Sequence, residues 1–328
     1  MKNYGIIGAG AWGTAISTIL QSNRIYIWSR NKKTVNSINS KKTNNYLKGI
    51  KLSKNLTATT DFNRLVDCKY LFIATPTQHT TAILKKLKKH KIRQNFIICS
   101  KGIEIRSGKF LSQVVEDIFP KSNIAVLSGP SFADEVAKKL PTAVLIASRK
   151  RKFFNEISKI IIKKNFRVYY SDDILGCQFG GAIKNVYAIG SGIVHGLKLG
   201  ENARSAFISR SIAEILRLNK IIGAKEKTFF GLSGLGDLIL TCNSTKSRNT
   251  NFGTMIAKNK RKKIINIIKN NKTVTEGYYS AKALYKVSIK YNIEMPILSS
   301  IYKILYNKAK IDNEIKLILG RSIKKEFY

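Results

Sequence analysis

Three glycines close to the start of the chain, Gly8, Gly10 and Gly13, have the spacing GxGxxG. The motif ends an apolar run that predicts a strand at Asn3–Gly8, and it opens a stretch of helical period at Trp12–Gln21. In this context the first glycine permits a tight turn, the second lets a pyrophosphate approach the backbone, and the third lets the helix pack closely on the sheet. The N-terminal N–H groups of the helix would face the phosphates. The motif therefore predicts a Rossmann-type dinucleotide site, whereas the glycines alone would indicate only a turn.

The first half of the chain alternates short apolar runs with amphipathic stretches. This rhythm is typical of an α/β fold, with a doubly wound, mostly parallel sheet between helices. The remaining predicted strands are Arg24–Trp28, Tyr70–Ala74, Asn95–Ser100, Asn123–Ser128, Thr142–Ala147 and Phe166–Tyr170. The remaining predicted helices are Thr77–His90, Lys109–Phe119, Ser131–Lys138 and Arg151–Lys164.

After Ser171 the pattern changes, and only helical period follows. The predicted helices are Ile174–Leu197, Ala203–Ile222, Arg248–Ala257, Gly277–Tyr291, Pro296–Ala309 and Asp312–Leu319. Because a single core rarely grows beyond about 250–300 residues, a chain of 328 residues is expected to form two domains. We place a dinucleotide-binding domain at residues 1–171 and an all-α substrate and catalytic domain at residues 172–328.

The formal net charge of +40 raises the alternative of a protein that binds nucleic acid or a membrane surface. Lysines lie on nearly every predicted surface helix, as in Lys85-Lys86 and Lys138-Lys139, and do not form a single arm or stripe. This spread favours a composition bias, so we expect no specific nucleic-acid partner. Only a sequence preference, or submicromolar affinity at physiological salt, would favour the alternative.

Metal sites and membrane segments are not expected. The four cysteines and three histidines are scattered singly, without the spacing of a metal site, and we expect the cysteines to be reduced. The apolar runs fall far short of the roughly 20 residues that cross a bilayer. The N-terminus lacks the charged, apolar and small-residue regions of an export signal, so we expect a cytoplasmic protein.

The end of the second predicted strand carries Ser29 and Arg30, at the place where the type of nicotinamide cofactor is usually read. An acidic residue there would bind the adenosine 2′-hydroxyl and favour NAD(H). A hydroxyl and an arginine suit a 2′-phosphate better, so we expect NADP(H) to be accepted, with NAD(H) as a further cofactor. The alternative is that Arg30 is a solvated loop residue that stacks on adenine.

Five ordered blocks of the sequence carry a resemblance to a known family. They are Gly8–Thr14, Ser100–Glu104, Leu127–Ala133, Gly180–Val186 and Gly231–Asn249. With these blocks the chain resembles the bacterial NAD(P)-dependent glycerol-3-phosphate dehydrogenases. The resemblance implies hydride transfer between the nicotinamide and C2 of dihydroxyacetone phosphate, which gives sn-glycerol 3-phosphate for phospholipid synthesis. It also implies a homodimer.

The resemblance implies that Lys184 gives or takes the proton of the C2 oxygen. A lysine can do this near neutral pH if burial and a neighbouring cation lower its pKa, and Lys101 could be that cation. The pair Gly180-Gly181 would let the helix of Lys184 approach the first domain closely. The alternative for Lys184 is an ordinary exposed lysine.

The block Gly231–Asn249 is assigned to substrate contact by the resemblance. Asp237 would orient or electrostatically tune the reactive lysine, and Thr241 would assist it. Arg248 offers a planar fork for two phosphate oxygens, and Ser247 and Asn249 add neutral donors. From the residues alone, Arg248 could be a charge at a helix start and Asp237 a cap.

The resemblance assigns further contacts in both halves. The residues implied to contact the substrate are Lys101, Gly129, Ser131, Lys184 and Asn185. The residues implied to contact the cofactor are Gly8, Gly10, Ala11, Trp12, Gly13, Arg30, Lys101, Ala133, Arg248, Val274 and Glu276. A related β-hydroxyacid dehydrogenase is the alternative enzyme, and dependence on Arg248 would separate a phosphorylated substrate from a carboxylate.

Overall fold

A computed structural model describes residues 3–20, 24–90, 95–259, 266–267, 275–323 and 325–326. The chain forms two compact units. The first comprises residues 1–101 and 109–178, and the second comprises residues 102–108 and 179–328. The domain boundary that we expect near residue 172 stays a prediction.

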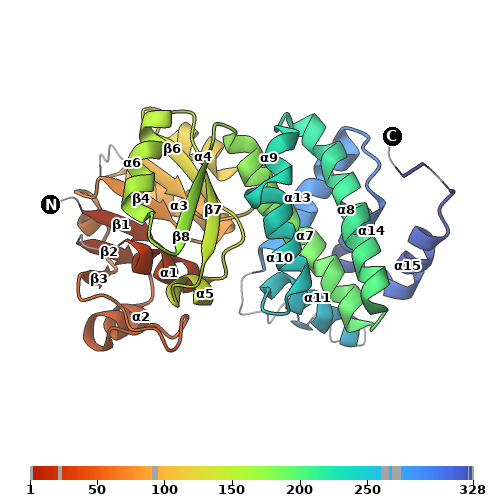
Figure 1. The fold of residues 1–328 in the computed structure, drawn as a ribbon, viewed down its shortest axis with the longest axis horizontal. Helices are drawn as coiled ribbons and strands as arrows, with labels where there is room; N and C mark the ends of the chain where they lie inside the picture. The colour runs from red at the N-terminus through yellow and green to blue at the C-terminus, as the bar shows by residue number, and fades with distance from the viewer. Residues whose placement is uncertain are drawn as a thin grey trace. The chain divides into compact units, whose positions relative to one another are not determined.

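The first unit is built on an eight-stranded sheet in the order β3-β2-β1-β4-β5-β6-β7-β8 (Figure 1). The strands are β1 (Tyr4–Ile7), β2 (Ile25–Trp28), β3 (Leu56–Thr59), β4 (Tyr70–Ile73), β5 (Asn95–Ile98), β6 (Ile124–Ser128), β7 (Thr142–Ala147) and β8 (Phe166–Ser171). Neighbouring strands are parallel except for β6 and β7, which are antiparallel. The expected Rossmann-type fold class is confirmed.

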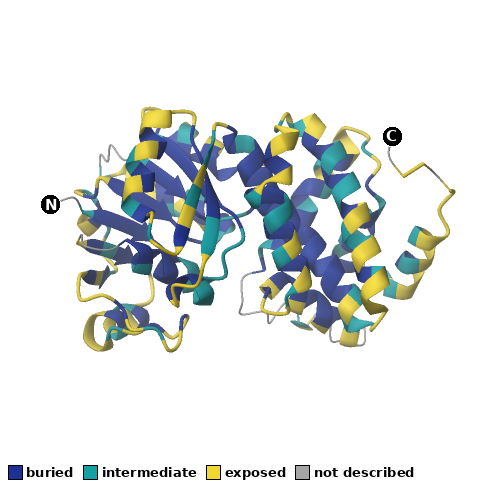
Figure 2. Ribbon diagram, in the orientation of Figure 1, coloured by how far each residue is buried: buried dark blue, intermediate teal, exposed yellow. Residues whose placement is uncertain are grey.

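Both faces of the central part of this sheet are buried, since every residue of β1, β4 and β6 is buried and successive side chains of a strand point to opposite faces. Ile6 packs in a core with the helices α1 (Ala11–Ile19), α5 (Ala133–Ala137) and α6 (Arg151–Ile161). Its neighbour Ile7 packs in the opposite core. That second core includes the helices α3 (Thr77–Lys88) and α4 (Leu111–Ile118). The central strands β1, β4 and β6 are therefore dark blue in Figure 2, whereas the edge strand β8 carries exposed and half-buried residues.

Several short elements are not predicted by the sequence pattern. The edge strand β3 alternates buried and half-exposed or exposed residues, and its four residues are too few for a distinct period. The same applies to short helices in both units. They are α2 (Lys32–Asn36), α9 (Glu226–Phe230) and α10 (Asp237–Asn243), together with the turns η1 (Ser37–Lys41), η2 (Phe62–Leu65) and η3 (Leu232–Gly236).

The described residues after Ser171 contain helices and no strand, as expected. The longer helices are α7 (Ile174–Gly196), α8 (Gly200–Ile222), α11 (Arg248–Lys258), α13 (Glu276–Lys290), α14 (Pro296–Tyr306) and α15 (Ile311–Leu319). Helix α7 is buried on all sides over most of its length, which is typical of a central helix (Figure 2). In the described part of the chain, no helix combines the length and apolar character needed to span a bilayer.

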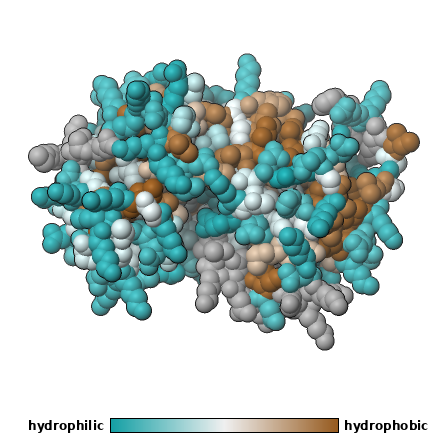
Figure 3. Space-filling model, turned by 60° about the horizontal axis from the view of Figure 1, so that its bottom comes forward, coloured by the Kyte–Doolittle hydropathy of each residue, from teal (hydrophilic) through white to brown (hydrophobic). Residues whose placement is uncertain are grey.

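The face of the molecule in Figure 3 is mostly hydrophilic, with separate smaller apolar areas. A mostly hydrophilic surface is ordinary for a chain in which 24% of the residues are charged.

Candidate active site

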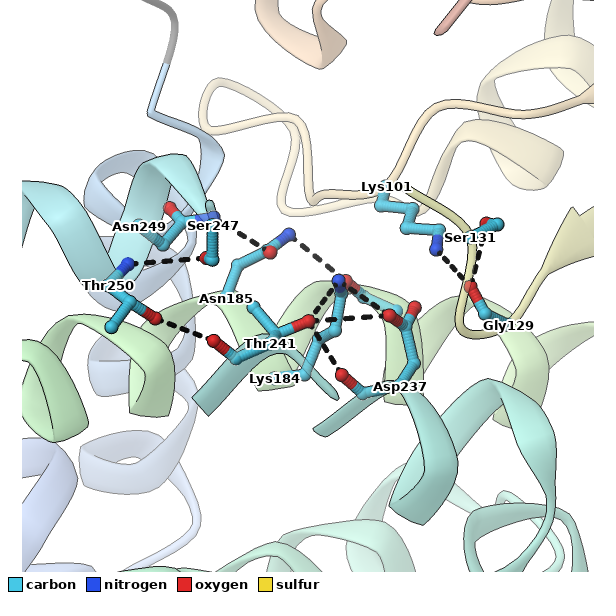
Figure 4. A network of polar contacts seen from close by, with 11 residues as sticks. Lys101, Gly129, Ser131, Lys184, Asn185, Asp237, Thr241, Ser247, Asn249 and Thr250 are labelled. Atoms are coloured by element: carbon cyan, nitrogen blue, oxygen red, sulfur yellow. Dashed lines mark hydrogen bonds and ion pairs between the residues drawn. The ribbon is translucent and has the colours of Figure 1, made fainter. Parts of the chain in front are cut away.

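Lys184 is a buried cation of the second unit. It lies on α7, and only 8% of its surface is exposed. Its Nζ donates to Asp237 Oδ1 at 2.8 Å and to Thr241 Oγ1 at 2.8 Å (Figure 4). A buried ammonium requires such partners, because an unpaired buried charge is strongly destabilising. The exposed lysine that the residues alone allowed is excluded.

Asp237 and Thr241 reach Lys184 together because both belong to α10, four residues apart, and therefore share one helix face. Both are almost fully buried, with exposures of 1% and 3%. The Thr241 hydroxyl donates to the backbone oxygen of Asp237 at 2.6 Å, so its lone pairs are available to the lysine. The geometry fixes the ammonium against a carboxylate and a hydroxyl of defined orientation.

The turn η3 before α10 packs directly on α7. A Cβ atom at Gly180 would lie 2.6 Å from the Ser233 oxygen and 2.9 Å from the Gly234 Cα, which leaves no space for a side chain. From the sequence we expect the glycines before Lys184 to allow a close approach toward the first domain. For Gly180 that expectation is corrected, because its nearest atoms belong to η3. This close approach brings the start of α10 beside the lysine.

Two buried asparagines form a chain of hydrogen bonds beside the lysine (Figure 4). Asn185 Nδ2 donates to the Gly181 oxygen at 3.1 Å, and Asn249 Nδ2 donates to Asn185 Oδ1 at 2.8 Å. The Gly277 backbone N–H then donates to Asn249 Oδ1 at 3.0 Å. These bonds connect α7, α11 and α13, so both asparagines also hold the helices together.

Helix α11 begins beside this chain. Ser247 is its N-cap, and the Ser247 side chain accepts from the Thr250 N–H at 3.3 Å. Arg248 is the first residue of the helix and is exposed, whereas Asn249 is buried. An exposed arginine at a helix N-terminus is well suited to an anion, because the helix dipole adds to its charge.

The glycine-rich turn in the first unit fits a pyrophosphate. Gly8 has a φ of +115°, and a Cβ atom at Gly13 would lie 1.9 Å from the Gly8 oxygen. A Cβ atom at Gly10 would meet nothing within 4 Å, and Gly10 caps α1 without a side-chain hydrogen bond. Ala11 and Trp12 begin that helix. The turn thus leaves space in front of the helix N-terminus, as a bound phosphate needs.

A second loop of the first unit places Lys101 and Ser131 on one carbonyl group (Figure 4). Lys101 Nζ donates to the Gly129 oxygen at 3.0 Å, and Ser131 Oγ donates to the same oxygen at 2.9 Å. Ala133 follows as the first residue of α5. The Trp12 indole N–H donates to the Cys99 oxygen at 3.1 Å, which ties the glycine-rich helix to the segment before Lys101.

The remaining expected cofactor residues lie on other segments of the chain. Arg30 follows β2 and is exposed. Glu276 is the first residue of α13 and is half-buried. Val274 lies outside the described residues. In the described part of the chain, no cluster of histidine, cysteine and acidic residues could hold a metal ion.

Sequence reasoning missed several buried polar residues that shape the site. Asn44 Nδ2 donates to the Ala9 oxygen, Thr250 Oγ1 donates to the Thr241 oxygen, and an Arg204 Nη2 group donates to the Cys242 oxygen. Each of these three side chains donates to a backbone carbonyl. Because every residue type has such a carbonyl, the sequence does not show which residue is the partner. Cys242 is itself buried, and burial raises the pKa of its thiol to about 12.

Comparisons with known proteins agree with this geometry. Models of the N-terminal and C-terminal parts of NAD-dependent glycerol-3-phosphate dehydrogenase match residues 3–154 and 173–316. The chain belongs to this family. Glycerol-3-phosphate dehydrogenases [NAD(P)+] from Erythrobacter litoralis and Parvibaculum lavamentivorans are each 39% identical, over 98% and 99% of this chain and 97% and 98% of theirs. The resemblance seen in the sequence is confirmed.

A solved structure extends the agreement to the whole fold of this dehydrogenase. Glycerol-3-phosphate dehydrogenase from Coxiella burnetii is 33% identical, with a TM-score of 0.92 over 98% of this chain and 99% of that chain. The protein is accordingly an NAD(P)-dependent glycerol-3-phosphate dehydrogenase by family, and its glycine-rich turn lies in the part that the N-terminal family model matches.

Proposed function

We propose that this enzyme reduces dihydroxyacetone phosphate to sn-glycerol 3-phosphate with NAD(P)H, and catalyses the reverse reaction, using Lys184 as the proton donor and acceptor. The observation that carries the assignment of Lys184 is its burial at 2.8 Å from both Asp237 and Thr241. A ketone reduction needs a proton at the oxygen as hydride reaches the carbon, and a positioned ammonium supplies it. The nicotinamide, when bound, supplies the hydride.

The neighbours of Lys184 have separate roles in this proposal. Asp237 holds the ammonium in one orientation and balances its charge inside the protein. Thr241 accepts a second hydrogen bond from the lysine. After proton transfer to the C2 oxygen, the neutral amine would remain hydrogen-bonded to these two groups until it regains a proton.

The substrate phosphate would be bound by Arg248 and the start of α11. The guanidinium fork matches two phosphate oxygens, and the helix N-terminus adds partial positive charge. Ser247, Asn185 and Asn249 would contribute further donors or hold the arginine's helix in place. Lys101, Gly129 and Ser131 of the first unit would complete the substrate contacts.

The cofactor would lie on the glycine-rich turn, with its pyrophosphate at Gly10 and the residues that follow. Arg30 would contact the adenosine 2′-phosphate, which predicts that NADPH is used at least as well as NADH. The residues proposed for the remaining cofactor contacts are Ala11, Trp12, Lys101, Ala133, Arg248, Val274 and Glu276.

The assay follows the absorbance of NADPH and NADH in the presence of dihydroxyacetone phosphate. Lys184→Met should abolish measurable turnover; circular dichroism checks that the variant is folded, and thermal melting measures the stability lost when buried Asp237 loses this partner. Lys109→Met is the matched control, because Lys109 pairs with Asp117 at the surface and should leave turnover unchanged. Full activity of Lys184→Met would remove its assigned role, and an inactive wild type would remove the proposed reaction.

We propose in addition that the enzyme is a cytoplasmic homodimer that supplies glycerol 3-phosphate for phospholipid synthesis. The dimer is the commonest closed assembly of soluble enzymes. Light scattering after gel filtration measures the mass in solution. A mass of one chain would contradict the dimer.

A further inference from the structure

Helix α10 carries two partners of Lys184, yet it is short. It comprises only Asp237–Asn243, seven residues. Helices of this length are marginal on their own, and the last four carbonyl groups of a helix lack partners within it. Any movement at this end would displace Thr241, which lies in the last turn. The position of the Thr241 hydroxyl against Lys184 therefore depends on what holds the end of α10.

Side chains from three other helices bind the terminal carbonyl groups. The Thr241 oxygen accepts from Thr250 Oγ1 on α11 at 2.6 Å. The Cys242 oxygen accepts from Ser191 Oγ on α7 at 2.8 Å and from Arg204 Nη2 on α8. Arg204 Nε also approaches Ser191 Oγ, at 3.4 Å. The Arg204 guanidinium thus contacts the Cys242 carbonyl and also the Ser191 hydroxyl, which donates to the same carbonyl.

Arg204 is an unusual residue to find at this place. It is 8% exposed, and the carboxylate beside it, Glu201, lies 3.9 Å away with its own side chain 83% exposed. Water therefore screens that ion pair, and it offsets little of the desolvation of the guanidinium. The negative end of α10 provides a better partner, because charge-assisted hydrogen bonds to terminal carbonyls combine with the helix dipole.

We propose that Arg204 is a positioning residue for proton transfer. By binding the Cys242 carbonyl it fixes the last turn of α10, and so keeps the Thr241 hydroxyl within hydrogen-bond distance of Lys184. The inference rests on the proposed function, because it treats Lys184 as the proton donor. The hydrogen bonds of Arg204 go to Ser191 and to the Cys242 carbonyl and not to Lys184 or Asp237, so the connection that they provide runs through the backbone of α10.

The surroundings of Arg204 allow a chemical test. The residue lines a surface cavity of about 230 Å³, together with His195, Lys198, Gly200 and Glu201. Removal of the side chain in Arg204→Ala would extend this cavity to the Cys242 carbonyl. Free guanidinium ion could then enter and donate to the carbonyl in place of the missing side chain.

The experiment compares five variants in steady-state reduction of dihydroxyacetone phosphate by NADPH. Arg204→Ala and Arg204→Met should lower kcat by about ten- to a hundredfold, because small misplacements of reacting groups have effects of this size. KM for both substrates should change little, since the binding residues lie elsewhere. Arg204→Lys should recover part of kcat, because an ammonium can still donate to the carbonyl.

Arg217→Met is the matched control. Arg217 lies on the same helix and also donates to a backbone carbonyl, that of Glu294 at 2.9 Å, which is not part of the site. Its kcat should equal that of the wild type. Millimolar guanidinium chloride should raise kcat of Arg204→Ala, whereas the same concentration of sodium chloride should not. Guanidinium chloride should not raise the kcat of Lys184→Met.

Several outcomes would overturn the proposal. They are an unchanged kcat in Arg204→Met, a loss confined to KM, and an equal loss in Arg217→Met. Failure of guanidinium to raise kcat of a folded Arg204→Ala would also count against it. If the alanine variant does not fold, the methionine and lysine variants decide, because they keep most of the side-chain volume.

A readout without turnover separates this inference from the proposed function. Alkylation of Cys242, located by peptide mass spectrometry, reports opening of the end of α10. Its rate should rise in Arg204→Met and stay low in Arg217→Met. If the wild type were inactive on dihydroxyacetone phosphate but alkylation of Cys242 were faster in Arg204→Met, the proposed function would fail. The inference that Arg204 fixes the end of α10 would then still stand. An unchanged alkylation rate in Arg204→Met would refute that inference.

Discussion

Asn44 Nδ2 lies 3.0 Å from the backbone oxygen of Ala9, the residue between the first two glycines of the nucleotide-binding turn. The same nitrogen donates to Thr14 Oγ1 at 2.8 Å, and the Tyr46 N–H donates to Asn44 Oδ1 at 3.1 Å. Asn44 is 2% exposed. The Asn44 amide therefore makes the nucleotide-binding turn more rigid. Breaking any of these bonds would leave a buried polar group without a partner.

Asn44→Ala should therefore weaken NADPH binding. Loss of one or two hydrogen bonds that shape the turn corresponds to about a tenfold rise in the dissociation constant. Titration of NADPH fluorescence measures it directly. Asn39→Ala is the matched control, because Asn39 makes two bonds to Ala58 in β3 and none to the turn. Equal losses of affinity in the two variants would contradict a specific role for Asn44.

Arg248 should affect substrate binding through the phosphate group. In Arg248→Ala we expect KM for dihydroxyacetone phosphate to rise by about a hundredfold, because a charge-assisted, two-pronged contact is lost. Arg248→Lys should show a smaller rise. The control is a change of substrate: dihydroxyacetone, which has no phosphate, should be reduced equally poorly by the wild type and by Arg248→Ala. A similar penalty on both substrates would mean that Arg248 acts on something other than the phosphate.

The cysteines should be unreactive in the folded protein. Cys68, Cys99, Cys177 and Cys242 are all buried, and burial raises the pKa of Cys68 to about 12 and that of Cys99 further still. The thiolate is the reactive form, so a raised pKa and lack of access both slow reaction. A colorimetric disulfide reagent should release little colour until denaturant is added, after which all four thiols should react. Rapid reaction of any thiol under native conditions would show local opening.

The difference between what could and could not be predicted has a physical cause. The glycine-rich turn is encoded within a few consecutive residues, so it could be predicted from the sequence. The buried central strands could be predicted as well, because they appear as continuous apolar runs. Lys184 was found through its sequence block. Arg204 and Asn44 bind backbone carbonyls from distant segments, and such partners leave no pattern. The edge strand Leu56–Thr59 was too short for its alternation to stand out.

Glu214 links three elements of the second unit and should make its stability depend on pH. Its carboxylate accepts from the Ile297 N–H at 2.6 Å, the Leu298 N–H at 3.0 Å and the Tyr187 hydroxyl at 2.8 Å. It therefore binds the N-terminus of α14 from α8. Truncation in Glu214→Ala should lower the free energy of unfolding by about 2–3 kcal/mol, because buried donors lose their acceptor. Urea denaturation measures this loss.

The pH dependence of this stability has a definite sign. Burial raises the pKa of Glu214 above its ordinary value of 4.5, although its three hydrogen bonds oppose the shift. A raised folded-state pKa means that the folded protein holds this proton more tightly than the unfolded chain does. The contribution is fully present below the unfolded pKa and is lost as the pH rises through the folded one. Glu214→Gln cannot titrate, so the wild type should lose stability relative to it as the pH rises above about 4.5. A stability difference that stays constant, or that grows in favour of the wild type over this range, would show that the hydrogen bonds from α14 and Tyr187 outweigh burial.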